Sequence, residues 1–249
     1  MPLLDHFHPP VENFAPWTSI GSFWITALTR SLNRKLPANG FRAYANVHLG
    51  HMVEADVGEF QSDPFDGDWS ASSSGGLLTE VAPAPVLTFS PDFPDAFEIR
   101  IVDTRKGKTL VAVIEIVSAS NKDRDESRGK LVRKCAGMVQ IGIGVVLVDP
   151  VTNRLANLHN LLMAKLGAPA RSQMADAPTY VSACRPKGEE DDRRLEVWCY
   201  PAPVGAPIPS VPLPLKDGPV VMVDLEGTYL EALADNGFPE ADLGTRSAG

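Results

Sequence analysis

The sequence has few cysteines and no long apolar run, and each shortage excludes a class of protein. Its three cysteines are Cys135, Cys184 and Cys199, which lie far apart without a C-x-x-C pair. They therefore predict neither a disulfide framework nor a thiolate metal site. No apolar run could span a bilayer, and the N-terminal residues lack the basic and apolar regions of a secretion signal. We expect a soluble cytoplasmic protein with no membrane partner.

Positive charge is also scarce. Lys and Arg total 23 against 31 Asp and Glu, so the formal net charge is −8. This balance argues against a protein that coats nucleic acid nonspecifically, because such affinity comes mainly from phosphate neutralisation by cations. The segment 122–134 differs, since it carries six basic side chains against three acidic ones. A local nucleic-acid contact by this segment is therefore compatible with the acidic total.

The spacing of apolar residues predicts an α/β protein. Apolar residues three and four positions apart predict a helix over 19–36. Alternation predicts strands over 43–49 and 52–60, which we expect to form a hairpin, and the Ser- and Gly-rich stretch 61–85 is expected to be a long surface excursion. Two further strands, 97–103 and 109–118, flank the turn at 105–108 and predict a second hairpin.

The second strand of that hairpin is almost continuously apolar, which is typical of a central strand covered on both faces. We predict a helix over 123–139, a strand over 145–148 and a helix over 155–166 after it. Strands over 179–184 and 195–200 follow, then a Pro-rich stretch between 201 and 219 with an extended polyproline-II path, and a helix over 223–236. A chain of 249 residues can bury one sizeable core.

Glu115 gives the sharpest local indication of a functional site. A carboxylate inside an apolar strand is costly to bury unless it is paired, protonated or bound to a cation. Asp56 lies in a predicted strand of its own, and pairing of the two hairpins would bring both carboxylates to the same strand ends. Two oxygen ligands with open positions suit Mg²⁺ or Mn²⁺. The alternative is a structural ion pair of Glu115 with Arg100, Lys122 or Arg128, with Asp56 simply solvated.

The stretch from Val113 to Lys122, the helix with Lys130, and the strand 146–150 together resemble the Uma-type restriction endonucleases of the PD-(D/E)XK superfamily. The chain resembles still more closely a bacterial family catalogued only as a domain of unknown function. That closer likeness extends to the segments 208–215 and 223–238, so the resemblance covers nearly the whole chain.

The resemblance implies a central mixed β-sheet flanked by helices, with a restriction-endonuclease-like core over 1–167 and a C-terminal extension over 168–249 packed on the same domain. It implies that Asp56 and Glu115 are metal ligands and that the backbone carbonyl of Ile116 completes the coordination. The superfamily's lysine, two residues after the glutamate, is replaced here by Val117.

Two lysines are candidates for the missing one. Uma-type sequences supply a lysine from the following helix, where Lys130 fits, and Lys122 is the rival. Either lysine is equally explained as a solvated residue of a basic helix.

Two functions follow as expectations. The first is metal-dependent hydrolysis of nucleic acid, DNA in preference to RNA, for which a homodimer would suit duplex cleavage although no sequence feature requires one. The second is a catalytically inactive interaction module with the same fold. The second function predicts that a fixed basic side chain neutralises Glu115.

Overall fold

The computed structural model describes residues 2–36, 40–48, 96–174, 177–188, 192 and 194–238. Its centre is a six-stranded sheet in the order β1-β2-β3-β4-β5-β6. β3 and β4 run parallel, and the other neighbouring pairs are antiparallel. The strands are β1 (Phe41–His48), β2 (Ala96–Asp103), β3 (Thr109–Ile116), β4 (Gly144–Asp149), β5 (Tyr180–Lys187) and β6 (Arg194–Pro201). The predicted α/β class with a mixed sheet is confirmed.

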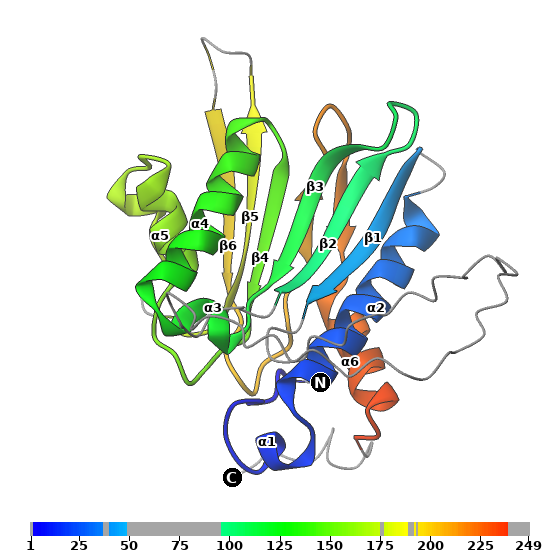
Figure 1. Cartoon of the computed structure of the whole chain (residues 1–249), viewed down its shortest axis with the longest axis vertical. Helices are drawn as coiled ribbons and strands as arrows, with labels where there is room; N and C mark the ends of the chain where they lie inside the picture. The colour runs from blue at the N-terminus through cyan, green and yellow to red at the C-terminus, as the bar shows by residue number, and fades with distance from the viewer. Residues whose placement is uncertain are drawn as a thin grey trace, which may run out of the picture.

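Helices cover both faces of this sheet (Figure 1). One face carries α2 and α6, and the other carries α4 and α5. The helices are α1 (Val11–Phe14), α2 (Trp17–Lys35), α3 (Ala119–Asp123), α4 (Asp125–Gln140), α5 (Leu158–Lys165) and α6 (Leu225–Asp235), with a 3-10 turn, η2, at Ala170–Ser172. No helix in the described ranges is long and apolar enough to cross a membrane.

A second, two-stranded sheet consists of β7 (Val211–Pro214) and β8 (Val220–Val223). β7 contacts β4 and β5, and Figure 1 places this hairpin on the face of the large sheet opposite α4. Val211 and Leu213 are fully buried there. The hairpin thus extends the hydrophobic core beneath the centre of the large sheet.

Local sequence patterns explain the elements that build the core. α2 buries Ile20, Trp24 and Leu28, which recur every four residues and so share one face of the helix. Gly21 lies on the same side, where an added Cβ would be only 3.0 Å from the ring of Phe97 in β2. β3 is buried without interruption from Val111 to Ile116, as expected for a central strand.

Most predicted elements are confirmed within a few residues, including the hairpin of β2 and β3 and the helix over the basic segment. α5 begins at Leu158, three residues later than predicted. The reason is a cap, because the Asn157 side-chain oxygen accepts a hydrogen bond from the backbone N–H of Asn160 at 2.9 Å. The strand predicted over 52–60, its hairpin and the excursion over 61–85 lie outside the described residues.

Candidate functional site

Two carboxylates, Glu98 and Glu115, lie side by side on neighbouring strands of the large sheet. They are paired residues in the antiparallel register of β2 and β3, so their side chains share one face. Phe97, the preceding residue of β2, packs against Trp17 of α2, with 6.2 Å between ring centroids. Strand alternation therefore directs Glu98 and Glu115 to the opposite face, where α4 lies. Both are almost completely buried, at 0% and 3% exposed.

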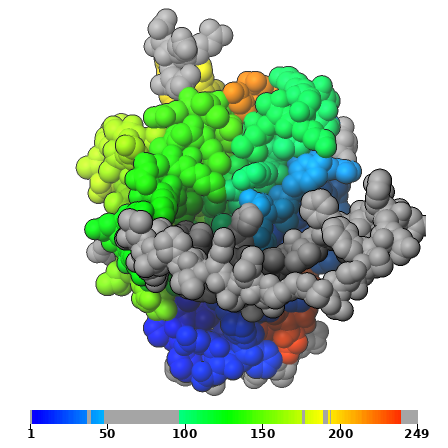
Figure 2. All heavy atoms as spheres, viewed as in Figure 1, coloured from blue at the N-terminus to red at the C-terminus, as the bar shows by residue number. Residues whose placement is uncertain are grey.

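Lys134 of α4 supplies the positive charge of this site. Its ammonium nitrogen lies 2.6 Å from Glu115 Oε1 and also ion-pairs with Glu98 Oε2. Arg100, half exposed on the same strand as Glu98, pairs with the other oxygen of Glu98. On this face the atoms of α4 and of the β2–β3 hairpin adjoin one another (Figure 2). Helix α4 thus brings one lysine to a pair of carboxylates that the strand register has already assembled.

The surroundings of the two carboxylates shift their pKa values in opposite directions. Burial raises the pKa of Glu115 to about 8 and the negative charge of Glu98 adds to that rise, while the charge of Lys134 acts against it. Burial also acts to raise the pKa of Glu98, but hydrogen bonds from Lys134 and Glu115, together with the charge of Lys134, hold it at about 2. Near neutral pH Glu115 therefore keeps a proton and Glu98 is ionised. The pair shares one proton because two adjacent buried carboxylates resist double ionisation.

The two neighbouring carboxylates favour the protonated form of Lys134. Burial acts to lower its pKa, yet the charges and hydrogen bonds of Glu115 and Glu98 outweigh burial and raise the pKa above the ordinary lysine value. Lys134 therefore remains protonated in the neutral range, and the trio of Glu98, Glu115 and Lys134 carries no net charge there.

The donor chemistry of the pair fits a divalent cation. Mg²⁺ and Mn²⁺ prefer carboxylate oxygens, and Glu98 and Glu115 offer them from adjacent strands. Glu115 Oε1 is buried, and the Lys134 ammonium lies 2.6 Å from it. Across the described residues, no group of three or more His, Cys, Asp or Glu side chains is arranged to hold a metal. The two glutamates alone would supply only part of the coordination shell of such an ion, and water would have to supply the rest.

The other predicted ligands are placed as follows. Asp56 lies outside the described residues, so its partnership with Glu115 stays a prediction. Ile116 follows Glu115 in β3, and its side chain is buried in the core, which leaves only its backbone carbonyl for a metal ion. The alternative ion pairs proposed for Glu115 were wrong in their partners, because Lys134 occupies that role.

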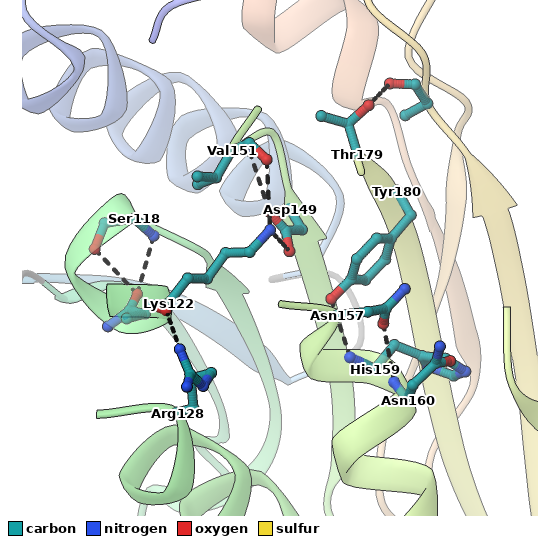
Figure 3. Close-up of polar contacts among 12 residues, drawn as sticks. Ser118, Lys122, Arg128, Asp149, Val151, Asn157, His159, Asn160, Thr179 and Tyr180 are labelled. Carbon is teal, nitrogen blue, oxygen red and sulfur yellow. Dashed lines mark hydrogen bonds and ion pairs between the residues drawn. The ribbon is translucent and has the colours of Figure 1, made fainter. Parts of the chain in front are cut away.

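Lys122, one of the two predicted lysines, is engaged elsewhere. It is 1% exposed, and its ammonium lies 3.0 Å from Asp149 Oδ2 at the end of β4. Figure 3 shows Lys122 reaching from α3 toward Asp149 and the backbone carbonyl of Val151, with Tyr180 of β5 nearby. Burial raises the pKa of Asp149 to about 6, while the charge of Lys122 acts against that rise. The contacts of Lys122 are those of a buried structural ion pair that joins α3 to β4.

Lys130, the other predicted lysine, points to solvent. Its side chain is 43% exposed and lies 3.4 Å from Glu126 one helical turn earlier. Such an exposed pair within a helix contributes only about 0.3–0.5 kcal/mol to stability. The lysine that reaches the carboxylates is instead Lys134, one turn further along α4.

Sequence reasoning missed Glu98 and Lys134 for identifiable reasons. Glu98 is a polar residue between two apolar ones, Phe97 and Ile99. The same alternation is typical of a strand with one face in solvent, so it does not indicate that Glu98 is buried. Lys134 lies next to the buried Cys135 in a basic segment, where a lysine is usually solvated. A usable indication was that Lys134 is three residues after Leu131, which places it beside the apolar stripe of its helix.

Comparisons with known proteins add no family or relative to this geometry. No family model, no curated protein and no solved structure matches the chain.

Proposed function

We propose that this protein is a metal-dependent phosphodiesterase that acts on nucleic acid, DNA in preference to RNA. The observation that carries the proposal is the buried pair of Glu98 and Glu115 with Lys134 beside both. The resemblance to the PD-(D/E)XK superfamily led to the same chemistry from Glu115. Glu98 now joins Glu115 as a proposed ligand, and Lys134 replaces Lys130 and Lys122 as the proposed catalytic lysine.

Each residue has a separate role in this proposal. Glu98 and Glu115 would hold Mg²⁺ or Mn²⁺, with the carbonyl of Ile116 and the carboxylate of Asp56 as further proposed ligands. A divalent ion, when bound, polarises a phosphoryl oxygen and makes a water molecule more acidic. Lys134 would stabilise the negative charge that develops on the phosphate in the transition state.

Substrate binding would use the basic side chains around the pair. Arg100 is half exposed beside Glu98, and Lys130 and Arg133 are exposed on α4. Contacts from such cations to phosphate oxygens position a nucleic acid without reading its sequence. A homodimer would let two such sites act on both strands of a duplex, and this remains part of the proposal.

Calorimetric titration with Mn²⁺ tests the metal site. We expect the wild type to bind and Glu115→Gln and Glu98→Gln each to bind at least about tenfold more weakly. Glu98→Gln loses an ionised oxygen ligand, and Glu115→Gln loses a carboxyl group that can release its proton to bind the ion. Glu126→Gln, which removes an exposed carboxylate from α4, is the matched control and should bind like the wild type. Far-UV circular dichroism would establish that each variant is folded. Failure of the folded wild type to bind Mn²⁺ would refute the proposed site.

A cleavage assay then tests the chemistry. Supercoiled plasmid and single-stranded RNA would be incubated with the protein and Mg²⁺. We expect nicking of the plasmid by the wild type, and Lys134→Met should keep Mn²⁺ affinity while losing cleavage, since the lysine acts on the phosphate and not on the ion. Equal cleavage by Lys134→Met would contradict the role given to this lysine.

The second candidate, a catalytically inactive interaction module, is favoured by one contact. Lys134 ion-pairs with both carboxylates, which is how a fixed basic side chain would neutralise a disused site. The same titration separates the two functions. Mn²⁺ binding by Lys134→Met but not by the wild type would mean that the lysine occupies the position of the cation, and this result would support the module.

A further inference from the structure

A pocket with a volume of about 400 Å³ lies at the end of the large sheet where β4 begins and β5 ends. The turn between β7 and β8 closes one side of it, and Figure 1 shows that turn at the same end of the molecule as the β2–β3 turn. Gly144, which lines the pocket, precedes Leu147 by three residues, and Leu147 is the neighbour of Glu115 in β4. About 10 Å of strand therefore separates this pocket from the carboxylate pair along β4.

Three cationic side chains line the pocket: Arg185, Lys187 and Lys216. Asp217 is the acidic side chain among the lining residues that the structure describes, and it lies 3.8 Å from the ammonium of Lys106. The lining is thus rich in positive charge although the whole chain carries a net charge of −8. Since like charges repel, such a cluster is most stable when an anion lies among its members.

Contacts within the described part of the chain leave these cations short of negative charge. Among the described residues, Arg185 and Lys187 pair with the same carboxylate, that of Glu196, at 3.5 Å and 3.3 Å. The ammonium of Lys216 donates to the backbone carbonyl of Ile141 at 2.6 Å, which fixes its position but does not neutralise it. An ammonium has three N–H donors and a guanidinium has five, so each side chain retains hydrogen-bonding capacity for a ligand.

Several residues that line the pocket are glycines, which leave space because they have no side chain. Gly142 has φ +86°, and an added Cβ there would lie 3.2 Å from Cε of Lys216, so a side chain would press on that lysine. Gly188 and Gly218 also line the space and present no side chain. A compact ligand can therefore approach the backbone closely between the three cations.

We propose that this pocket binds a small phosphate-bearing molecule. A phosphate group carries up to two negative charges and several acceptor oxygens, which matches three cations that line one pocket better than a single carboxylate does. The volume is within the range of pockets that hold small ligands, and it leaves room for a modest organic group attached to the phosphate. The site needs no metal ion and does not depend on the phosphodiesterase proposal.

Calorimetric titration with inorganic pyrophosphate, at low ionic strength and with EDTA present, tests this inference. We expect the wild type to bind and Lys216→Gln and Lys187→Gln each to bind at least about tenfold more weakly, because each loses a charged hydrogen-bond donor. The matched control is Lys165→Gln, which removes an exposed lysine from α5 and should bind like the wild type. Glu115→Gln should also bind like the wild type, which separates this site from the carboxylate pair.

Two results would overturn the proposal. One is the absence of pyrophosphate binding by the folded wild type. The other is equal loss of affinity in Lys165→Gln and Lys216→Gln, which would mean that the whole surface attracts anions. A parallel titration with sulfate gives a further comparison, and affinity equal to that of pyrophosphate would refute selectivity for phosphate.

Discussion

Replacement of Lys122 by Met should destabilise the protein strongly. Lys122 and Asp149 are 1% and 0% exposed in their side chains and lie 3.0 Å apart. Met fills nearly the same volume but leaves the Asp149 carboxylate buried without its cation. Removing one partner of a buried ion pair costs about 3–5 kcal/mol. For a chain of this size each kcal/mol corresponds to about 2–4 °C, so the melting temperature should fall by about 6–20 °C.

The pH dependence of this effect has a definite sign. The pKa of Asp149 is about 6 in the folded protein, above its ordinary value of 3.8. As pH rises, the unfolded state loses the Asp149 proton at a lower pH than the folded state does. The folded state therefore binds more protons between about pH 4 and pH 6, and the contribution of Asp149 to stability falls across that range. Without Lys122 the folded pKa rises further, so in Lys122→Met the fall should continue above pH 6. The deficit relative to the wild type should be small at pH 4 and largest near neutral pH.

Urea unfolding followed by tryptophan fluorescence, at pH 4.5 and pH 7.5, measures both effects. Asp149→Asn added to Lys122→Met should recover at least half of the loss, because the buried charge is then removed from both partners. Lys130→Met is the matched control, since Lys130 is 43% exposed, and should change the unfolding free energy by less than about 0.5 kcal/mol. The reasoning is refuted if Lys122→Met loses less than about 1 kcal/mol, or if the double variant is no more stable than the single one.

Two further predictions concern the carboxylate pair and the contact between β4 and β7. Glu115 has a folded pKa of about 8, above its ordinary value of 4.5, so its contribution to stability falls as pH rises between those values. Urea unfolding in EDTA should therefore show Glu115→Gln gaining on the wild type from pH 5 to pH 8, and a constant difference would contradict the assigned protonation. An added Cβ at Gly144 would lie 1.9 Å from the backbone oxygen of Pro214, so Gly144→Ala should lower the unfolding free energy by about 1–3 kcal/mol or more. Gly137 lies in α4, and beyond the backbone of its own helix no described atom lies within 4 Å of an added Cβ. Gly137→Ala should therefore stabilise by about 0.5–1 kcal/mol, and thermal melts of both variants measure the contrast.

The elements of this protein follow from local sequence. Apolar residues at three- and four-residue spacing predicted α2 and α4, and the apolar run from Val111 to Ile116 predicted a strand covered on both faces. These predictions succeed because the repeat of a helix or strand is set by the backbone itself, and burial selects apolar residues at that repeat. Element ends that depend on a single cap, such as Asn157 before α5, were less accurate.

Of the three residues of the candidate site, the sequence predicted Glu115 but not Glu98 or Lys134. Glu115 stood out because a carboxylate within an apolar strand needs a partner, but the identity of that partner is not a local property. Glu98 reaches Glu115 only through the register of β2 on β3, and Lys134 reaches both only through the angle at which α4 packs on the sheet. The same holds for the pocket of Arg185, Lys187 and Lys216, which are brought together by the contact of β7 with β4 and β5.

Residue type and local spacing thus determined which segments form helices and strands and that one carboxylate must be buried. The tertiary structure alone decided which charges meet. The physical reason is that periodicity is encoded within a few residues, whereas register and packing depend on contacts between segments far apart in the chain.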